Sequence, residues 1–242
     1  ANTLNFSLFI ARKIQKAQNI KGSIISPVIA AATLAISLGM VLMIVSIATG
    51  IGLKKAISNK IVGFSGHISI SRYDLNNSFE NAPIGLDSAL TAEISSLRGI
   101  NQIQPIGTKA GILKGTEDFE GVVLKGVGAD YSWDYFKDFL IEGRVPDYSG
   151  KRNEEVLMSE YIANRLKFKL GDTFQMIFAK DDPEKLPNII TYTIVGIYNS
   201  GFQDFDATYV IGDIRHLQRI NNWSSDLVGS FEVFVDDYNQ LQ

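Results

Sequence analysis

The feature that most constrains this chain is a run of thirty-two residues, Gly22 to Leu53, that contains no charged side chain. A helix needs about 20 apolar residues to cross a hydrocarbon core of roughly 30 Å, so this run is longer than one crossing requires. Pro27 suits the first turn of a helix, because the N–H that it lacks would have no partner there. We therefore predict that residues 22–60 form a transmembrane helix whose far end leaves the bilayer as a stalk.

The sequence before this run leaves two questions open. A cleaved signal peptide also places basic residues before apolar ones, but its apolar part has only about 7 to 15 residues, which favours an uncleaved anchor. Residues 1–21 place Phe6, Ile10 and Ile14 on one helical stripe and Arg12 on the other side. This pattern predicts an amphipathic helix in the membrane interface; a short helix packed on another protein is the alternative.

Charge divides the chain unequally. Eight Lys and Arg precede the first acidic residue, Asp74, whereas the rest carries 15 basic and 26 acidic residues. Basic residues beside an apolar span suit anionic lipid headgroups, and an acidic remainder argues against nucleic acid as a partner. Lys and Arg are balanced on the two sides of the span, so the positive-inside rule does not set its orientation.

Few residues offer catalytic or metal chemistry. The chain has no cysteine and two histidines, which disfavours a zinc site of Cys or His ligands. Motifs for phosphate-binding loops, serine hydrolases and zinc proteases are absent. The acidic pairs Asp181 with Asp182 and Asp204 with Asp206 lie in polar segments, where we interpret them as loop residues rather than as catalytic or metal groups. We expect no enzymatic activity, no metal and no cofactor in this polypeptide.

Residues 61–242 are predicted to form one extracytoplasmic α+β domain, because strand patterns outnumber helical ones and the two alternate irregularly. Residues 236–242 resemble the cap and first turn of a helix, so we expect the domain to be incomplete at its C-terminus. The helix near residue 90 should turn Leu97 inward. Strands are predicted at 66–73, 100–113, 121–127, 156–159, 174–179, 191–198, 207–211 and 230–235, and helices at 86–97, 131–140, 160–167 and 213–221.

The order of several segments resembles one known family. FIARKI, the apolar span and GLKKAISNKIVGFSGHISI are followed by GVVLKGVGADY, LIEGRVP, SEYIANRLKFKLGD and SGFQDFDATYVI. This order is similar to that of FtsX/MacB-type ABC transporter permeases, and most of all to the lipoprotein-releasing permeases of Gram-negative inner membranes. The resemblance implies a MacB-like periplasmic core domain inserted after the first of four transmembrane helices. It also implies ATP hydrolysis on a separate cytoplasmic subunit and a second permease protomer, identical or homologous.

The resemblance draws attention to a few residues. In lipoprotein-releasing permeases, a hairpin at the matching position captures a periplasmic lipoprotein chaperone; a solvated hairpin tip is the alternative here. The stretch Gly201 to Asp206 resembles a turn of the family that we interpret as fold-defining, and Gly171 with Asp172 as a structural turn. The hairpin residues are Lys180, Asp181, Asp182, Pro183, Glu184, Lys185, Leu186 and Pro187.

Within the predicted span, small residues would let helices approach closely in a dimer, and methionines add adaptable apolar surface for acyl chains; generic lipid contact is the alternative for each. The residues singled out are Gly39, Met40, Met43 and Ser46.

We therefore predict a permease subunit in the bacterial inner membrane, with its large domain in the periplasm, that releases lipoproteins to a periplasmic carrier. The alternatives are a MacB-type efflux permease, an FtsX-type regulator of cell division, and a bitopic membrane-anchored binding or sensor domain.

Overall fold

The computed structural model describes residues 6, 8–13, 25–73, 79–86, 88–115, 118–180 and 184–236. The chain divides between Ile57 and Ser58 into two compact units, which we describe separately. The predicted division into an interfacial helix (1–21), a transmembrane helix with its stalk (22–60) and an extracytoplasmic domain (61–242) stays a prediction. The incomplete helix predicted at 236–242 lies almost wholly outside the described residues.

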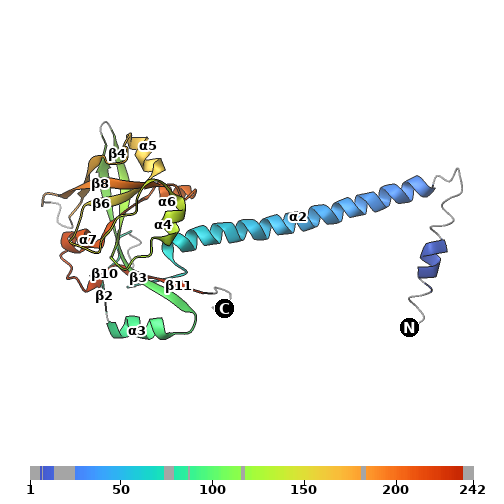
Figure 1. The fold of residues 1–242 in the computed structure, drawn as a ribbon, viewed down its shortest axis with the longest axis horizontal. Coiled ribbons are helices and arrows are strands. Elements are labelled where there is room, and N and C mark those ends of the chain that lie inside the picture. The colour runs from blue at the N-terminus through green and yellow to red at the C-terminus, as the bar shows by residue number, and fades with distance from the viewer. Residues whose placement is uncertain are drawn as a thin grey trace. The chain divides into compact units, whose positions relative to one another are not determined.

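The first unit is helical. Residues 8–13 form a helical segment in which Lys13 Nζ lies 5.9 Å from the ring centre of Phe9; the rest of the predicted amphipathic helix is mostly outside the described residues. Helix α2, Ile25–Ser65, continues through this unit and into the second one (Figure 1). At about 1.5 Å per residue its 41 residues extend for roughly 60 Å. Pro27–Ser65 is the stretch of the described chain that is long and apolar enough to span a membrane.

The second unit is built on a large mixed sheet, in which the strand order is β1-β11-β3-β4-β9-β6-β8-β5 and β7 pairs with both β3 and β8. The strands are β1 (Ile68–Ser71), β2 (Ile84–Gly85), β3 (Ile100–Lys114), β4 (Phe119–Val127), β5 (Leu140–Gly143), β6 (Glu155–Ser159), β7 (Thr173–Phe178), β8 (Asn188–Tyr198), β9 (Tyr209–Asp213), β10 (Leu227–Val228) and β11 (Ser230–Val235). The helices are α3 (Ser88–Ser96), α4 (Asp134–Phe139), α5 (Glu160–Leu166), α6 (Gln203–Asp206) and α7 (Ile214–Ile220).

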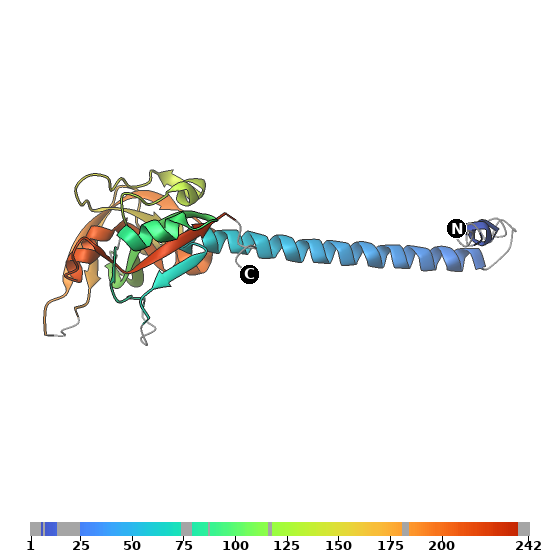
Figure 2. The same ribbon diagram turned by 90° about the horizontal axis from the view of Figure 1, so that it is seen from below.

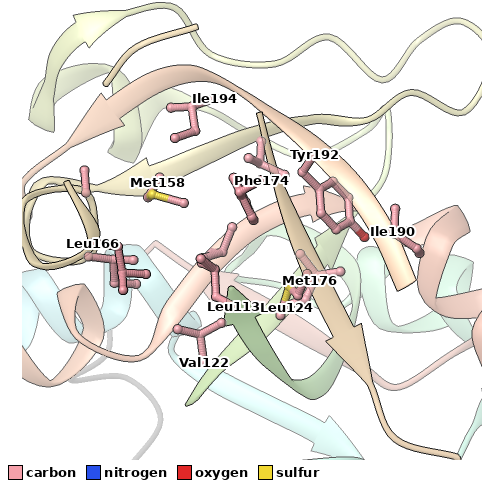
Figure 3. Close-up of a cluster of buried hydrophobic side chains, with 14 of the residues drawn as sticks. Leu113, Val122, Leu124, Met158, Leu166, Phe174, Met176, Ile190, Tyr192 and Ile194 are labelled. Carbon is pink, nitrogen blue, oxygen red and sulfur yellow. The ribbon is translucent and has the colours of Figure 1, made fainter. Parts of the chain in front are cut away.

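Six of these strands close into a barrel. The circuit runs from β3 through β4, β9, β6, β8 and β7 and returns to β3, because β7 is hydrogen-bonded on both sides. Alternate side chains of these strands point into a common interior, where Leu124, Met158, Met176 and Tyr192 are fully buried (Figure 3). Closure removes the free edges of these six strands. Strands β11 and β5 extend the sheet by pairing with parts of β3 and β8.

Two short helices of this unit, α5 and α7, begin at side-chain caps. Ser159 Oγ accepts a hydrogen bond from Ile162 N at the start of α5, and Ile162, Ala163 and Leu166 of this helix are all buried. Asp213 accepts from Arg215 N at the start of α7. These caps satisfy N–H groups that a first helical turn leaves free.

The fold is α+β, as predicted, and the predicted helices and long strands are present. The short strands β2, β5 and β10 and the helix α6 were not predicted. Leu97 does not turn inward: it follows α3 and is 57% exposed. The turn at Gly171 has the positive φ, +85°, that glycine tolerates.

Candidate functional site

The last turn of α2 ends in an aromatic cluster of the second unit, and Phe64 is its centre. The Phe64 side chain is 2% exposed. Its ring stacks on Phe205 of α6, with 4.3 Å between centroids and 13° between planes, and lies 5.0 Å from Tyr209 of β9 and 5.8 Å from Phe136 of α4. We call Phe64, Phe136, Phe205 and Tyr209 the aromatic socket. Helices α4 and α6 lie beside this end of α2 (Figure 1).

A buried ion pair lies beneath Phe64. Lys125 of β4 and Glu232 of β11 are almost completely buried, and Lys125 Nζ lies 2.7 Å from Glu232 Oε1 and 3.0 Å from Oε2. The same ammonium donates a hydrogen bond to the Phe64 carbonyl and lies 4.5 Å from the centre of the Phe64 ring. It thereby satisfies one of the carbonyls that the end of a helix leaves without a partner.

Burial opposes both charges of this pair. Loss of hydration lowers the pKa of Lys125 and raises the pKa of Glu232, and the attraction between the two groups acts against both shifts. The partner is therefore what favours the charged form of each group against the effect of burial. Charged side chains are rarely fully buried without such pairing.

Helix α2 passes into the sheet without a linker. Only Gly66 and His67 separate its end from β1. Gly66 has φ +72° and donates from its N–H to the Val62 carbonyl at 2.7 Å, while His67 N donates to the Val233 carbonyl at 2.9 Å. His67 Nδ1 also accepts from Val235 N at 3.1 Å. The helix end is therefore bonded directly to strand β11.

The connection between β7 and β8 contains the hairpin residues predicted from the resemblance. Asp181, Asp182 and Pro183 lie outside the described residues. The described flanks of this connection extend away from the body of the unit (Figure 2), and Leu186 is 84% exposed. Lys180, Glu184, Lys185 and Pro187 border it.

Beside this connection, the outer face of the barrel carries a row of isoleucines. Ile112, Ile177 and Ile189 are register partners on β3, β7 and β8. Ile112 and Ile189 are exposed, and Ile177 is half-buried. A contiguous exposed apolar row of this kind is a surface suited to protein contact.

The residues singled out within the membrane helix all lie on α2 and are solvent-exposed: Gly39, Met40, Met43 and Ser46. A Cβ atom placed on Gly39 would meet nothing within 4 Å. These positions are open to lipid or to another helix.

Of the two acidic pairs, Asp181 and Asp182 lie outside the described residues. Asp204 and Asp206 both lie in the short helix α6 and not in a loop; Asp204 is exposed, but Asp206 is buried and accepts from Ser200 Oγ at 2.7 Å. The expectation that both lie in a solvated polar segment was therefore wrong for Asp206. Among the described residues no group of three or more His, Asp or Glu is placed to hold a metal ion.

Sequence reasoning missed Lys125 and Glu232. Their strands contain a signal, because Lys125 lies between Val123 and Val127 on one side of an alternating strand. A lysine that shares one face of a strand with valines indicates either that this face is exposed or that the lysine is buried beside an acidic partner. Its partner lies 107 residues away, so the sequence alone does not identify it.

The sequence profile of the MacB-like periplasmic core domain matches residues 29–239. No curated protein matches the chain.

Among solved structures, the extracellular domain of the noncanonic ABC-type transporter YknZ from Gram-positive bacteria is 14% identical, with 72% of this chain and 87% of that chain covered and a TM-score of 0.47. The periplasmic region of MacB from Actinobacillus actinomycetemcomitans is 17% identical, with 73% and 78% covered and a TM-score of 0.47. A domain of a putative permease protein from Porphyromonas gingivalis is 19% identical, with 61% of each chain covered and a TM-score of 0.35.

The profile match includes most of the apolar helix and the whole sheet, which supports an ABC-type transporter permease anchored in a membrane with its large domain outside the cytoplasm. Because that match covers most of its length, the chain belongs to the family of MacB-like periplasmic core domains.

Proposed function

We propose that this protein is a permease protomer whose first transmembrane helix transmits motion to the extracytoplasmic domain. The observation that carries the proposal is the continuity of α2, which ends in the aromatic socket with Phe64 buried and only two residues before β1. A helix joined to a sheet through a flexible linker would lose the direction of a displacement. Here the hydrogen bond from His67 N to the Val233 carbonyl holds the short connection against β11.

The energy source lies outside this polypeptide. ATP hydrolysis occurs on a separate cytoplasmic ATPase subunit, and two permease protomers pair in the membrane. Small side chains such as Gly39 and Ser46 allow close helix approach, while Met40 and Met43 offer adaptable apolar surface to acyl chains. All four are exposed on α2, as such contacts require.

For the substrate, we propose lipoproteins that are released from the outer leaflet of the inner membrane to a periplasmic carrier. The support is the resemblance of the sequence to lipoprotein-releasing permeases. The β7–β8 connection, with Leu186 exposed at its edge, would contact the carrier, and the neighbouring isoleucines would widen that contact.

The test is reconstitution of the full-length permease with its ATPase in vesicles that contain a lipid-anchored protein. We expect the lipoprotein to stimulate ATP hydrolysis and to appear in the soluble fraction only when a carrier is added. The same protein without its lipid anchor is the matched control and should do neither. A rate of ATP hydrolysis that does not change when the lipoprotein is present would contradict the proposed lipoprotein release.

The partner recovered by the extracytoplasmic face separates the remaining functions. Recovery of a lipoprotein chaperone supports release. An outer-membrane adaptor instead indicates efflux of the MacB type, and a wall hydrolase indicates an FtsX-type regulator. Leu186→Asp should abolish carrier recovery, whereas Tyr73→Asp, at an exposed site after β1, should not.

A further inference from the structure

We propose that Lys125 and Glu232 form a clamp that fixes the register of α2 against the sheet, so that a displacement of the helix moves β4 and β11 together. This inference rests on the proposed function, because it assigns a role in transmitting motion. Lys125 Nζ joins three elements at one point: its own strand β4, the carboxylate of Glu232 on β11, and the Phe64 carbonyl of α2.

A hydrogen bond restricts the position of the helix more than apolar contacts do. The apolar contacts of Phe64 in the aromatic socket depend mainly on buried area and little on orientation. A hydrogen bond from an ammonium to one carbonyl depends strongly on angle and distance. A rotation or a slide of the helix would keep part of the apolar contact but would remove the Phe64 carbonyl from Lys125 Nζ. The clamp therefore selects one register.

The clamp acts across strand β3. Strand β3 lies between β4 and β11, with Lys125 opposite Thr108 and Glu232 opposite Gln104. The ion pair thus crosses over β3. It links the wall of the barrel, through β4, to the outer strands β11 and β1, of which β1 follows the helix in sequence. Motion of α2 enters the barrel directly and not only through Gly66 and His67.

Burial of this ion pair has an energetic cost. Replacement of a buried ion pair by apolar residues of similar volume is often neutral or stabilising for the fold. Removal of one partner is destabilising, because it leaves a buried charge unpaired. Stability alone is thus a weak reason for this pair to exist at the end of a helix. A role in fixing register gives the two charges a function that apolar side chains would not perform.

The experiment compares Lys125→Met, Glu232→Leu and the double variant in the full-length permease with its ATPase. Each single variant should unfold at a lower temperature than the double variant. In the double variant, lipoprotein released per ATP hydrolysed should fall about tenfold, which corresponds to the loss of one charge-assisted hydrogen bond. Backbone amides of residues 60–67 should exchange hydrogen about tenfold faster, for the same reason.

The matched control is the surface pair Arg144 and Glu155, whose side chains are 57% and 26% exposed. The double change Arg144→Met and Glu155→Leu should leave release per ATP and exchange at residues 60–67 unchanged.

The two readouts separate failure of the clamp from failure of the proposed function. If the unaltered complex releases no lipoprotein, release is wrong, and amide exchange still tests the clamp. If the Lys125→Met/Glu232→Leu variant keeps the exchange rates of the unaltered chain at residues 60–67, the clamp is wrong whatever is transported. Faster exchange with undiminished release per ATP would equally overturn the role in coupling.

Discussion

A Cβ atom on Gly63 would lie 2.0 Å from Cδ2 of Tyr135 and 2.3 Å from its Cε2. The Tyr135 ring of α4 therefore lies directly against the backbone of α2, where a β-carbon on residue 63 would not fit. Interiors packed to this density do not absorb an added methyl group without displacement of a neighbour. Glycine here permits close approach, since Gly63 lies inside the helix and needs no special backbone angle.

Gly63→Ala should consequently destabilise the second unit by about 1–3 kcal/mol, the usual cost of overpacking. Intrinsic helix propensity acts in the opposite direction, because alanine is favoured over glycine by about 1 kcal/mol. Gly52→Ala, on the same helix with nothing within 4 Å of the added carbon, is the control and should not destabilise. Thermal unfolding followed by near-ultraviolet circular dichroism measures both; equal shifts for the two variants would contradict the close contact.

Phe64→Ala tests the aromatic socket. Removal of a buried phenylalanine ring costs about 3–5 kcal/mol, and Phe64 also loses its stacked partner Phe205. Ile61→Ala, one turn earlier and 39% exposed, should cost much less. Urea unfolding of the chain in detergent gives both free energies. Equal urea midpoints for Phe64→Ala and Ile61→Ala would show that the aromatic socket does not contribute to stability.

Asp206→Ala should destabilise the turn after β8. The Asp206 carboxylate accepts from Ser200 Oγ at 2.7 Å and from Ser200 N at 3.3 Å. Its removal leaves a buried N–H without an acceptor, which costs about 1–3 kcal/mol. Asp204→Ala, two residues earlier at an exposed position, should change the free energy of unfolding by less than about 0.5 kcal/mol. The difference between the two, measured by urea unfolding, decides whether this is a fold-defining turn.

Local patterns were enough to predict the long elements of this fold. The short apolar run at 156–158 and the helical pattern at 160–167 each depend on neighbours in sequence, and both elements were predicted correctly. The long apolar run likewise predicted α2. Such patterns arise because one face of each element is buried against a common core.

Other features depend on partners that are remote in sequence. Closure of the barrel requires β7 to pair with β3 as well as with β8, and nothing in residues 173–178 specifies the second pairing. The two-residue strands β2 and β10 exist only because they meet each other. The same holds for the candidate site, since Lys125 became recognisable as a buried group only when Glu232 and Phe64 were seen beside it.

Acid should weaken the bond between the end of α2 and β11. His67 Nδ1 accepts from Val235 N, which requires an unprotonated Nδ1. Burial lowers the pKa of His67 below its ordinary value of 6.5, so the unfolded chain binds this proton more readily than the folded one. Stability is therefore fully present above about pH 6.5 and falls as the pH decreases from there towards the lower pKa of the folded state.

His67→Asn isolates this contribution, because the Asn side-chain carbonyl can accept from Val235 N and does not titrate. His216, whose pKa burial also lowers, stays in both proteins and contributes equally to each. Urea unfolding at pH 7.5 and 5.5 should show a smaller loss of stability for His67→Asn than for the unaltered chain. Amide exchange of Val235 should quicken at pH 5.5, relative to the intrinsic rate, only when His67 is present; identical pH dependence in the two proteins would exclude the assigned bond.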